Sequence, residues 1–337
     1  MSVSASSAAV SEAITAPDIS GDIVVDYRTG AVTGAAPHER LALLGLRIAA
    51  SLLVPLENLG FSKIAKLVRI VLPSKKMVLM RLDDDALLRV PYCDPYWGSL
   101  VRPQQDEHQE INTFVRMMRE VPYAFLDCGA NYGIWSVRVT GNAAGHKPSV
   151  AIEAASDTFG ILEANQALNG NRFRIMNKAI GKVSGEHVKI YGEKHEARST
   201  VAPDETSKPI LDCETISLND VAALDDFEGF VTFVVKLDVE GVEIEALEGA
   251  QQLIDSDTVV LFEEHGSDPT HEVSDFAMNT LGMRLFFFHN DQVREITELK
   301  QIDAIKTSKR QGYDMAGTTS QKWIDRITPL IRTGTEG

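Results

Sequence analysis

Short continuous runs of hydrophobic residues alternate with predicted helices over most of the chain beyond residue 120. Five runs have the length of strands, and they occupy residues 125–127, 149–153, 173–181, 230–237 and 258–262. The intervening stretches predicted as helices are 134–140, 157–168 and 243–253. Strands that alternate with helices predict an α/β protein with a doubly wound parallel sheet. The nearly all-apolar run 230–237 predicts the buried centre of that sheet.

The pattern before these runs is different. Residues 1–37 are rich in Ala, Ser and Thr and have neither a basic start nor a sustained apolar period, so they predict a disordered tail without a secretory signal. Residues 38–76 predict an amphipathic helical extension. Their most hydrophobic part, 41–56, is shorter than the roughly 20 residues that span a bilayer and contains Arg47 and Pro55, which argues against a transmembrane helix.

Residues 61–72 predict an amphipathic helix with a basic side and an apolar side. The basic side carries Lys63, Lys66 and Arg69, and the apolar side carries Phe61, Ile64, Leu67, Val68 and Val71. Two interpretations follow from this pattern. The helix could lie on an anionic membrane surface, or it could be a cap that packs on the catalytic domain and leaves its basic residues in solvent.

Residues 77–121 are predicted to form a hairpin and a helix that lead into the core domain, 122–337. Alternating apolar residues in 77–100 flank Asp83-Asp84-Asp85, which is interpreted as the hairpin turn. An acidic helix start at 106–110 precedes an apolar face and is expected to flank the ligand cleft. A second hairpin is expected around residues 184–185.

Composition narrows the classes of partner. A 337-residue chain with 44% hydrophobic residues can bury a substantial core. The net charge of −15 argues against a nucleic-acid partner, because phosphate binding requires a basic surface. The three widely spaced cysteines offer neither a disulfide framework nor a CxxC metal site, which fits a reducing cytoplasm.

The run 125–133, FLDCGANYG, predicts a strand that enters a tight glycine turn and then a helix. Asp127 at the strand tip would repel a pyrophosphate, but it suits a cationic ligand such as S-adenosylmethionine. Counting from Gly129, Asn131 stands where a dinucleotide fingerprint needs its second glycine. A nicotinamide oxidoreductase therefore fits less well than a methyltransferase. The remaining alternative is that Gly129 and Gly133 merely form a turn.

Further acids follow the later strands. Glu153 stands 20 residues beyond Gly133, where a carboxylate can accept hydrogen bonds from ribose hydroxyls in either class of enzyme. Asp238 ends the run 230–237. Because the carboxyl ends of parallel strands meet at one edge, these acids and Asp127 are expected to converge there. A noncatalytic scaffold would not need them.

Glu263 and His265 follow the last predicted strand and, being two residues apart, point to the same side of an extended chain. They are candidates for a base, a substrate contact or a metal contact. The alternative interpretation is that His265 is a hydrogen-bonded loop residue without a chemical role.

Several of these segments together resemble the FkbM family of S-adenosylmethionine-dependent methyltransferases over about residues 95–325. The matching segments are FLDCGANYG (125–133), AIE (151–153), NKAIG (177–181), VKLDVEGVEIEALEG (235–249) and LFEEH (261–265). The most specific is KLDVEGVEIEALEG, which is similar to the family's KxDVEGxExxxLxG signature. Cys128 and Ala154 depart from the family pattern where an aliphatic residue and proline are usual, and neither change removes a polar contact.

The resemblance implies a class I methyltransferase fold, which is Rossmann-like, with a doubly wound sheet of seven strands. It also implies O-methylation of a hydroxyl on a sugar, glycan or polyketide. By position, the residues implied at the methionine end of the cofactor are Asp127, Gly129, Asn131 and Gly133, and Ala130 and Asp238 are also implied to bind the cofactor. Glu153 is implied at the ribose, and Asn177 and Ala179 at the adenine edge.

The implied catalytic residues are Asp238 and Glu240, which would face the methyl group and the acceptor. Glu263 and His265 complete the candidates, and Asp238, Glu263 or His265 could accept the hydroxyl proton. An oxygen-rich cluster could instead bind Mg²⁺. The expectation here is no metal, because the carboxylates have simpler roles as cofactor and backbone contacts.

The expected acceptor is a hydroxyl of a saccharide, either a polysaccharide or a lipid-linked saccharide. A polyketide-like small molecule is the alternative. An acidic enzyme suits neutral or cationic acceptors better than polyanions. The protein is expected in the cytoplasm, with peripheral membrane contact through residues 61–72 as one option.

Overall fold

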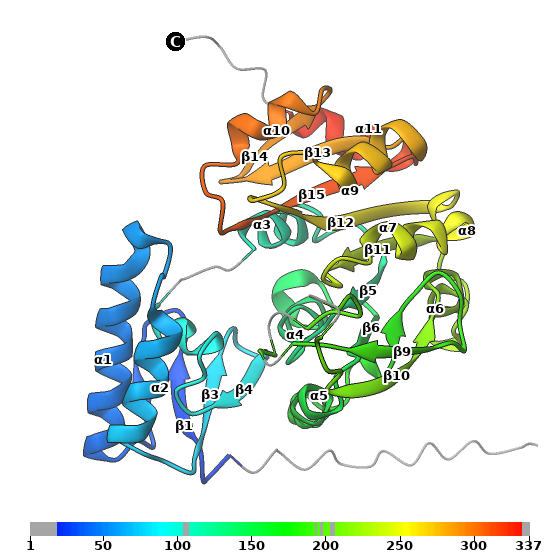
Figure 1. Ribbon diagram of the computed structural model, residues 1–337. Coiled ribbons are helices and arrows are strands. Elements are labelled where there is room, and N and C mark those ends of the chain that lie inside the picture. Colours follow the sequence, from blue (N-terminus) through cyan, green and yellow to red (C-terminus); the bar gives the residue numbers. More distant parts are fainter. Residues whose placement is uncertain (1–18, 104–107, 193, 196–197, 203–205, 332–337) are drawn as a thin grey trace, which may run out of the picture.

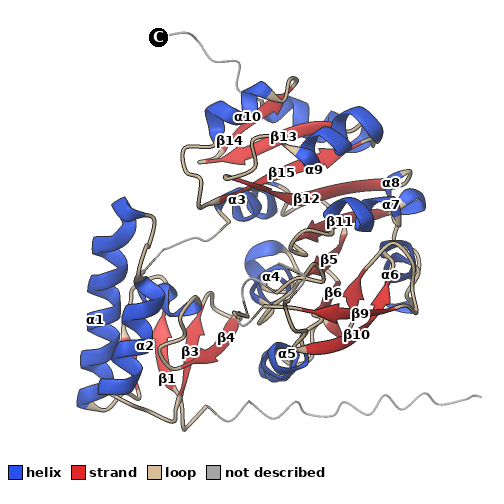
Figure 2. Cartoon of the chain, in the orientation of Figure 1, coloured by secondary structure: helices blue, strands red, loops and turns tan. Residues whose placement is uncertain are grey.

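The computed structural model describes residues 19–103, 108–192, 194–195, 198–202 and 206–331. Its main body is an eight-stranded sheet in the order β14-β13-β15-β12-β11-β5-β6-β7 (Figures 1 and 2). The strands are β5 (Ala124–Cys128), β6 (Ser149–Ile152), β7 (Arg174–Met176), β11 (Thr232–Leu237), β12 (Asp257–His265), β13 (Arg284–His289), β14 (Gln292–Ile296) and β15 (Gly312–Thr318).

The central strands β7, β6, β5, β11 and β12 are parallel, and β15 is antiparallel to both β12 and β13. With β15 and β13 they make a sheet of seven strands, the number that the resemblance implies. The expected sheet is therefore present, and β14 extends it by an eighth strand that pairs antiparallel with β13.

Helices cover both faces of this sheet. They are α3 (Gln109–Met117), α4 (Ile134–Val139), α5 (Ser156–Leu168), α6 (Leu218–Ala222), α7 (Glu243–Glu248), α8 (Gln251–Ile254), α9 (Glu272–Asp275), α10 (Lys300–Ile305) and α11 (Gln321–Ile327). Side chains of β5 alternate between the two layers: Phe125 belongs to the hydrophobic cluster that includes residues of α3, α4, α5 and α11, whereas Leu126 belongs to the cluster that includes residues of α6, α7, α8 and α10. This two-sided burial explains the continuous apolar runs.

The predicted helix at 243–253 is divided into α7 and α8. The division falls at Gly249, where the backbone packs directly on Lys182: a Cβ on Gly249 would lie 2.4 Å from the Lys182 carbonyl oxygen. The prediction of one continuous helix is therefore wrong, because tertiary contact overrode the local helical pattern.

A small second sheet lies beside the carboxyl end of β7. It contains β8 (Ala179–Ile180), β10 (Leu211–Ile216) and β9 (His187–Ile190), in that order. β10 pairs parallel with β8 and antiparallel with β9. The predicted hairpin at 184–185 is wrong, because β10 lies between the two strands that this turn connects.

The amino-terminal part forms a separate layer (Figure 1). Its four-stranded sheet has the order β2-β1-β3-β4, with β1 at Ile23–Asp26, β2 at Val32–Thr33, β3 at Met77–Arg81 and β4 at Leu87–Pro91. The prediction of a disordered tail over 1–37 is wrong for residues 23–26 and 32–33, which form β1 and β2; residues 1–18 lie outside the described residues. β1 pairs in parallel with β3, so a distant segment orders it.

Two helices cover this sheet, α1 (Pro37–Leu53) and α2 (Phe61–Val71), joined through a 3-10 turn at Val54–Leu56. A further 3-10 turn, Trp97–Val101, follows β4. The helix expected at 61–72 is present, and two residues of its apolar side, Leu67 and Val71, are 60% and 64% exposed. Among the described residues, no helix has the length and apolar character needed to cross a membrane.

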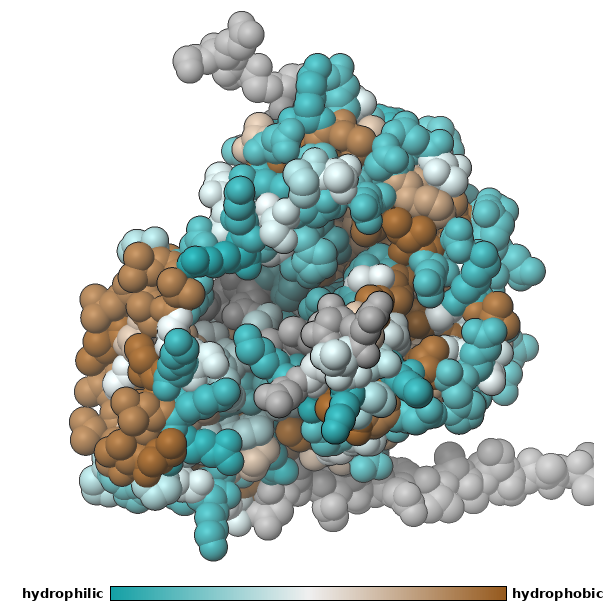
Figure 3. Space-filling view, viewed as in Figure 1, coloured by the Kyte–Doolittle hydropathy of each residue, from teal (hydrophilic) through white to brown (hydrophobic). Residues whose placement is uncertain are grey.

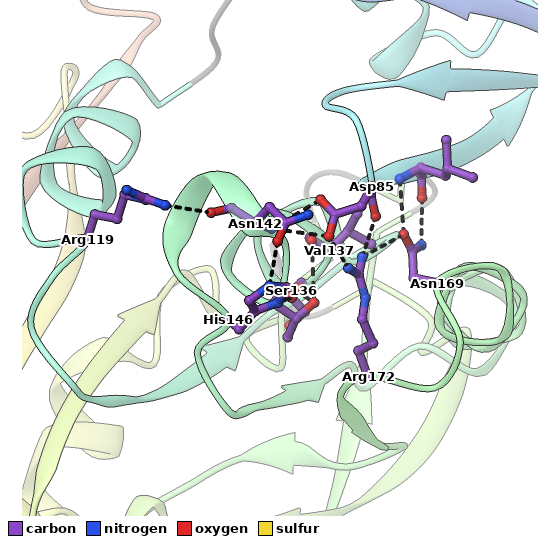
Figure 4. A network of polar contacts seen from close by, with 10 residues as sticks. Asp85, Arg119, Ser136, Val137, Asn142, His146, Asn169 and Arg172 are labelled. Atoms are coloured by element: carbon purple, nitrogen blue, oxygen red, sulfur yellow. Dashed lines mark hydrogen bonds and ion pairs between the residues drawn. The ribbon is translucent and has the colours of Figure 1, made fainter. Parts of the chain in front are cut away.

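The turn between β3 and β4 fastens this layer to the main body. Asp85 in that turn accepts a hydrogen bond from Arg172 Nη1 at 2.7 Å and from the Asn142 backbone amide at 3.1 Å (Figure 4). The Asn169 side-chain oxygen accepts from the Leu87 amide at 3.0 Å. The acidic triplet therefore forms the expected turn, and one of its members also links the two layers.

Candidate active site

The turn after β5 brings two backbone segments into direct contact at Gly129. Gly129 has a φ of +74°, and a Cβ there would lie 1.8 Å from the carbonyl oxygen of Asp238. The amides of Gly129 and Ala130 both donate to the carbonyl of Ile152, at 3.0 and 2.9 Å. Glycine is therefore required where the ends of β5, β6 and β11 meet.

Asp127 lies behind this turn and does not line the cavity in front of it. Its side chain is fully buried, and Oδ2 accepts hydrogen bonds from the Ser136 amide at 2.9 Å and the Ser136 hydroxyl at 2.8 Å. Asp127 thus anchors the start of α4. Oδ1 lies 3.9 Å from Lys236 Nζ.

Lys236 connects Asp127 to the cavity. Register places it beside Asp127 on the neighbouring strand, and its ammonium donates to the Gly129 carbonyl at 3.0 Å and pairs with Asp238 Oδ2 at 3.0 Å. Burial opposes its charge, but Asp238 and Asp127 raise the pKa of Lys236 above its usual range. Lys236 therefore stays protonated between two carboxylates. Sequence reasoning included Lys236 in a motif without assigning it a role.

Removing this ammonium is expected to destabilise the fold. Lys236→Met would leave Asp127 and Asp238 buried without their shared cation, and breaking a buried ion pair by removing one partner costs about 3 to 5 kcal/mol. The free energy of unfolding, measured in urea, checks this. Lys300→Met removes a surface pair with Glu298 and is expected to change stability by less than about 1 kcal/mol. Equal effects in the two variants would contradict the structural role.

A pocket opens in front of the Gly129 turn. Its walls come from the turn, the ends of β6, β8 and β11, and the segment before α3. Of the predicted cofactor residues it is lined by Gly129, Ala130, Asn131, Glu153, Ala179 and Asp238. Asp127, Gly133 and Asn177 are outside this lining.

Glu153 is oriented by backbone amides. Its Oε2 accepts from the Asn131 amide and its Oε1 from the Ala155 amide, both at 2.9 Å. Burial raises the pKa of Glu153, against the lowering effect of those amides. Each carboxylate oxygen keeps a further lone pair, so the pair of oxygens could accept hydrogen bonds from two neighbouring hydroxyls.

The far wall of the pocket is apolar. It includes Ile152, Ile180 and Ile190, beside Ala179. Asn177 supports this wall from outside, because its side-chain amide donates to the carbonyls of Glu153 and Ala154 at 2.8 and 3.0 Å. A flat aromatic ring would fit against such a surface.

An aromatic rim closes the other side, and sequence reasoning did not identify it. Trp97 Nε1 donates to the side-chain oxygen of Asn131 at 3.0 Å, and the side-chain nitrogen of Asn131, Nδ2, donates to the His195 carbonyl at 2.9 Å. The His195 ring stacks on Tyr132 with centroids 4.8 Å apart. Because Trp97 and His195 are far from the glycine turn in the sequence, only the fold brings them to this pocket.

Three carboxylates gather at the edge of the pocket, from Asp238, Glu240 and Glu263. One oxygen of each lies within 4.8 Å of the others. Asp238 and Glu240 line both this pocket and a larger cleft, whereas Glu263 and His265 line only the cleft. A Cβ on Gly312 would lie 1.3 Å from Glu263 Oε1, so the Glu263 carboxylate occupies the space that a side chain at position 312 would need. Such an oxygen set could hold a divalent cation.

The three acids differ in proton affinity. Burial opposes ionisation of Asp238, but Lys236 and His108 outweigh it and lower the pKa of Asp238. Burial and the charge of Asp238 raise the pKa of Glu240 to about 7. Burial, Asp238 and Asp314 raise the pKa of Glu263 to about 7. The site therefore combines one firmly ionised carboxylate with two that titrate near neutrality.

His108 and Asp314 complete the cluster and were not predicted. His108 Nδ1 lies 3.0 Å from Asp314 Oδ2. Burial opposes protonation, but Asp314 raises the pKa of His108 to about 10, so the ring is an imidazolium at neutral pH. His108 lines both cavities. Asp314 is on β15 and lies directly across from Glu263 on β12. No local sequence pattern indicates this pairing.

The larger cleft has a volume of about 1260 Å³ and a mostly polar lining. It extends from the carboxylates past His289 and Arg310 to Asn58 and Phe61, between α1 and α2. In Figure 3 a hollow lies between the amino-terminal helices and the main body. A long polar molecule could lie in this cleft with one end at Asp238 and Glu240.

Comparison with known proteins gives one family match. A family model described as the methyltransferase FkbM domain matches residues 127–313. No curated protein matches the chain.

Several solved structures of methyltransferases are similar at low identity. Precorrin-6y C5,15-methyltransferase from Geobacter metallireducens GS-15 is 10% identical with a TM-score of 0.35, over 62% of this chain and 87% of that one. The tRNA (uracil-54, C5)-methyltransferase of Pyrococcus abyssi, in complex with S-adenosyl-L-homocysteine, is 12% identical with a TM-score of 0.35, over 72% and 44%. The tRNA m1G37 methyltransferase of M. jannaschii is 13% identical with a TM-score of 0.36, over 76% and 64%.

Proposed function

Because the chain belongs to the FkbM family of S-adenosylmethionine-dependent methyltransferases, we propose that it methylates a hydroxyl oxygen of a saccharide, either a polysaccharide or a lipid-linked saccharide. The observation that carries this proposal is the position of Asp238 and Glu240, which line both the pocket and the larger cleft. Carboxylate oxygens are thus available where a methyl donor in the first cavity would meet an acceptor in the second.

The chemistry of the pocket fits the donor. Glu153 would accept hydrogen bonds from the ribose hydroxyls, and the apolar wall at Ile152 and Ile180 would hold the adenine. The carboxylate of Asp238 would attract the positive charges of the methionine end. Bound S-adenosylmethionine supplies an electrophilic methyl group on its sulfonium. Asp127 would act indirectly in this arrangement, by holding α4 and balancing Lys236.

The cleft residues would orient the acceptor and take its proton. An alcohol must lose a proton as it is methylated, and a positioned carboxylate within hydrogen-bond reach can accept it. Glu240 is our candidate for this base, because it lines both cavities and its pKa is about 7. Glu263 and His265 line only the cleft and would bind acceptor hydroxyls. Alignment by these walls would itself lower the barrier.

The size and polarity of the cleft favour a saccharide over a polyketide-like small molecule. A volume of about 1260 Å³ exceeds what a single drug-sized ligand needs. Side chains that can hydrogen-bond hydroxyls, among them His289, Arg310 and Gln311, line it. A polyketide-like acceptor would leave much of this polar surface without partners, at a cost in binding free energy.

A metal-dependent version of the reaction would use the same three carboxylates. Mg²⁺ bound there could orient and acidify acceptor hydroxyls. We favour the version without metal, in which Lys236 and His108 offset the charge of Asp238 and a proton on Glu263 relieves the remaining repulsion between the acids. Methyl transfer that persists in EDTA and gains nothing from added Mg²⁺ is the expected result.

Transfer of labelled methyl groups from S-adenosylmethionine tests the acceptor class. The protein would be incubated with separated polysaccharide, lipid and small-molecule fractions of the source cell, and labelled products would be hydrolysed and identified by mass spectrometry. We expect O-methyl sugars from the polysaccharide or lipid fraction. Label on nitrogen or carbon, or label confined to small lipophilic metabolites, would contradict the proposal.

A further inference from the structure

Helix α1 has two apolar faces, and only one of them is packed. Leu43, Leu46 and Ala50 are buried against the amino-terminal sheet and α2. On the opposite side, a row at i, i+3, i+7 and i+11 is open to solvent, with exposed fractions of 60% for Leu41, 51% for Leu44, 51% for Ile48 and 71% for Leu52. A surface helix normally carries polar residues on such a face.

The exposed apolar row continues across the connection into α2. The members there are Val54, Leu56, Leu59, Leu67, Ile70 and Val71, between 45% and 76% exposed. We call these residues and the four of α1 the apolar face; Figure 3 shows a broad hydrophobic surface over these helices. Among the described residues, the other large hydrophobic side chains that are exposed are Val183, Val201, Ile210 and Val231, which are scattered. A contiguous patch of this kind indicates an interaction site.

The exposed charged residues around the apolar face are basic, whereas the acids of the same segment, Glu39 and Glu57, are buried and half-buried. Between residues 37 and 72, the exposed charged side chains are Arg40, Lys63, Lys66 and Arg69. All are basic, although the chain as a whole has a net charge of −15. On α2, helical spacing puts Lys63 and Lys66 on the same side as Ile70. The surface is therefore apolar with basic residues interspersed, in an otherwise acidic protein.

We propose that α1 and α2 dock this apolar face onto an anionic lipid bilayer. An interfacial helix buries apolar side chains at the boundary of headgroups and acyl chains, while its basic residues contact anionic headgroups. The helix α1, of 17 residues, is about 25 Å long and would lie in the membrane plane. Spanning is not involved, since no described helix could cross a bilayer.

The larger cleft meets the docking surface. Its lining includes Val54, Asn58, Phe61 and Ser62, which belong to the connection between α1 and α2 or to the start of α2. Docking would therefore bring one part of the cleft to the lipid surface while Asp238 and Glu240 lie further inside. The inference about docking itself rests on the apolar face and its charges, and it holds for any acceptor.

A second copy of the chain would fit this face less well than a membrane. Two copies joined through it would bring two sets of the same basic residues together, and like charges in close contact oppose association. An anionic bilayer instead supplies the complementary charge. Vesicle composition and salt can therefore separate the two partners.

Vesicle sedimentation with the full-length protein tests the proposal. We expect the protein to bind phosphatidylcholine vesicles that contain phosphatidylglycerol. Its affinity for pure phosphatidylcholine vesicles should be lower by about tenfold or more. The variant Leu44→Glu/Ile48→Glu/Ile70→Glu should reduce binding by at least tenfold. Lys63→Glu/Lys66→Glu should remove the preference for anionic lipid. High salt should weaken binding of the wild type.

Val183→Glu/Val231→Glu is the matched control, because these two valines are 53% and 64% exposed and belong to the main body, Val183 between β8 and β9 and Val231 directly before β11. It should bind vesicles as the wild type does, and all variants should keep the wild-type Tm and bind S-adenosylmethionine. The proposal is overturned if the wild type does not bind anionic vesicles, or if the control loses binding equally. It is also overturned if light scattering shows a dimer that the triple variant dissociates, since the face would then be covered by a second copy.

Discussion

Glu153→Ala is expected to weaken S-adenosylmethionine binding by at least about 100-fold, which corresponds to about 2.7 kcal/mol. A hydrogen bond to a charged group is worth about 1.5 to 3 kcal/mol, and the proposed role gives Glu153 two such bonds to the ribose. Its carboxylate is already oriented by the amides of Asn131 and Ala155, so little freedom is lost when the ligand binds. Isothermal titration calorimetry measures the effect.

The control for Glu153→Ala is Glu163→Ala, at an exposed position of α5. It should leave the affinity unchanged. Because Glu153→Ala also frees two buried amides, its Tm and circular dichroism must show that the fold persists. A folded Glu153→Ala protein that binds S-adenosylmethionine as tightly as the wild type would remove Glu153 from the ribose site. Binding of NAD by the wild type, measured in the same instrument, should be absent.

Residues whose role follows from local spacing could be predicted from sequence. The distance from Gly133 to Glu153 is set by one helix and one short strand, so counting residues identified a carboxylate that does line the pocket. Asp127 shows where counting stops being sufficient. Its place at the tip of β5 was predictable, but the direction of its side chain depends on Ser136 in α4 and Lys236 on a neighbouring strand.

Features made by distant pairing could not be predicted. β1 has four residues and pairs in parallel with β3, about fifty positions later in the sequence. Such a short segment has no apolar period from which a strand could be predicted. Asp314 raises the pKa of His108, and the two residues are 206 positions apart in the sequence. The apolar residues of α2 were identified as one side of an amphipathic helix, but periodicity alone does not say whether an apolar side is packed; Leu67 is not.

Glu240→Gln is expected to lower kcat by 10² to 10⁴, about the contribution of a positioned general base. The substitution keeps the shape of the side chain and removes its ability to accept the acceptor proton. It should leave the affinity for S-adenosylmethionine within about tenfold of the wild type, because only the half-buried Glu240 changes its charge while Asp238 stays ionised.

The pH profile separates a base from a merely structural residue. A base works in its deprotonated form, and the pKa of Glu240 is about 7 in the free protein, since burial and Asp238 disfavour its charge. The wild-type kcat/KM for S-adenosylmethionine should therefore fall about tenfold per pH unit below 7 and level off above it. Glu240→Gln should lose that rise and keep a low activity across the range.

Glu263→Gln discriminates between the two acids with similar pKa: it should retain the rise and alter mainly the KM for the acceptor. The opposite pattern, with the rise lost in Glu263→Gln and kept in Glu240→Gln, would transfer the role of base to Glu263, which lines only the acceptor cleft.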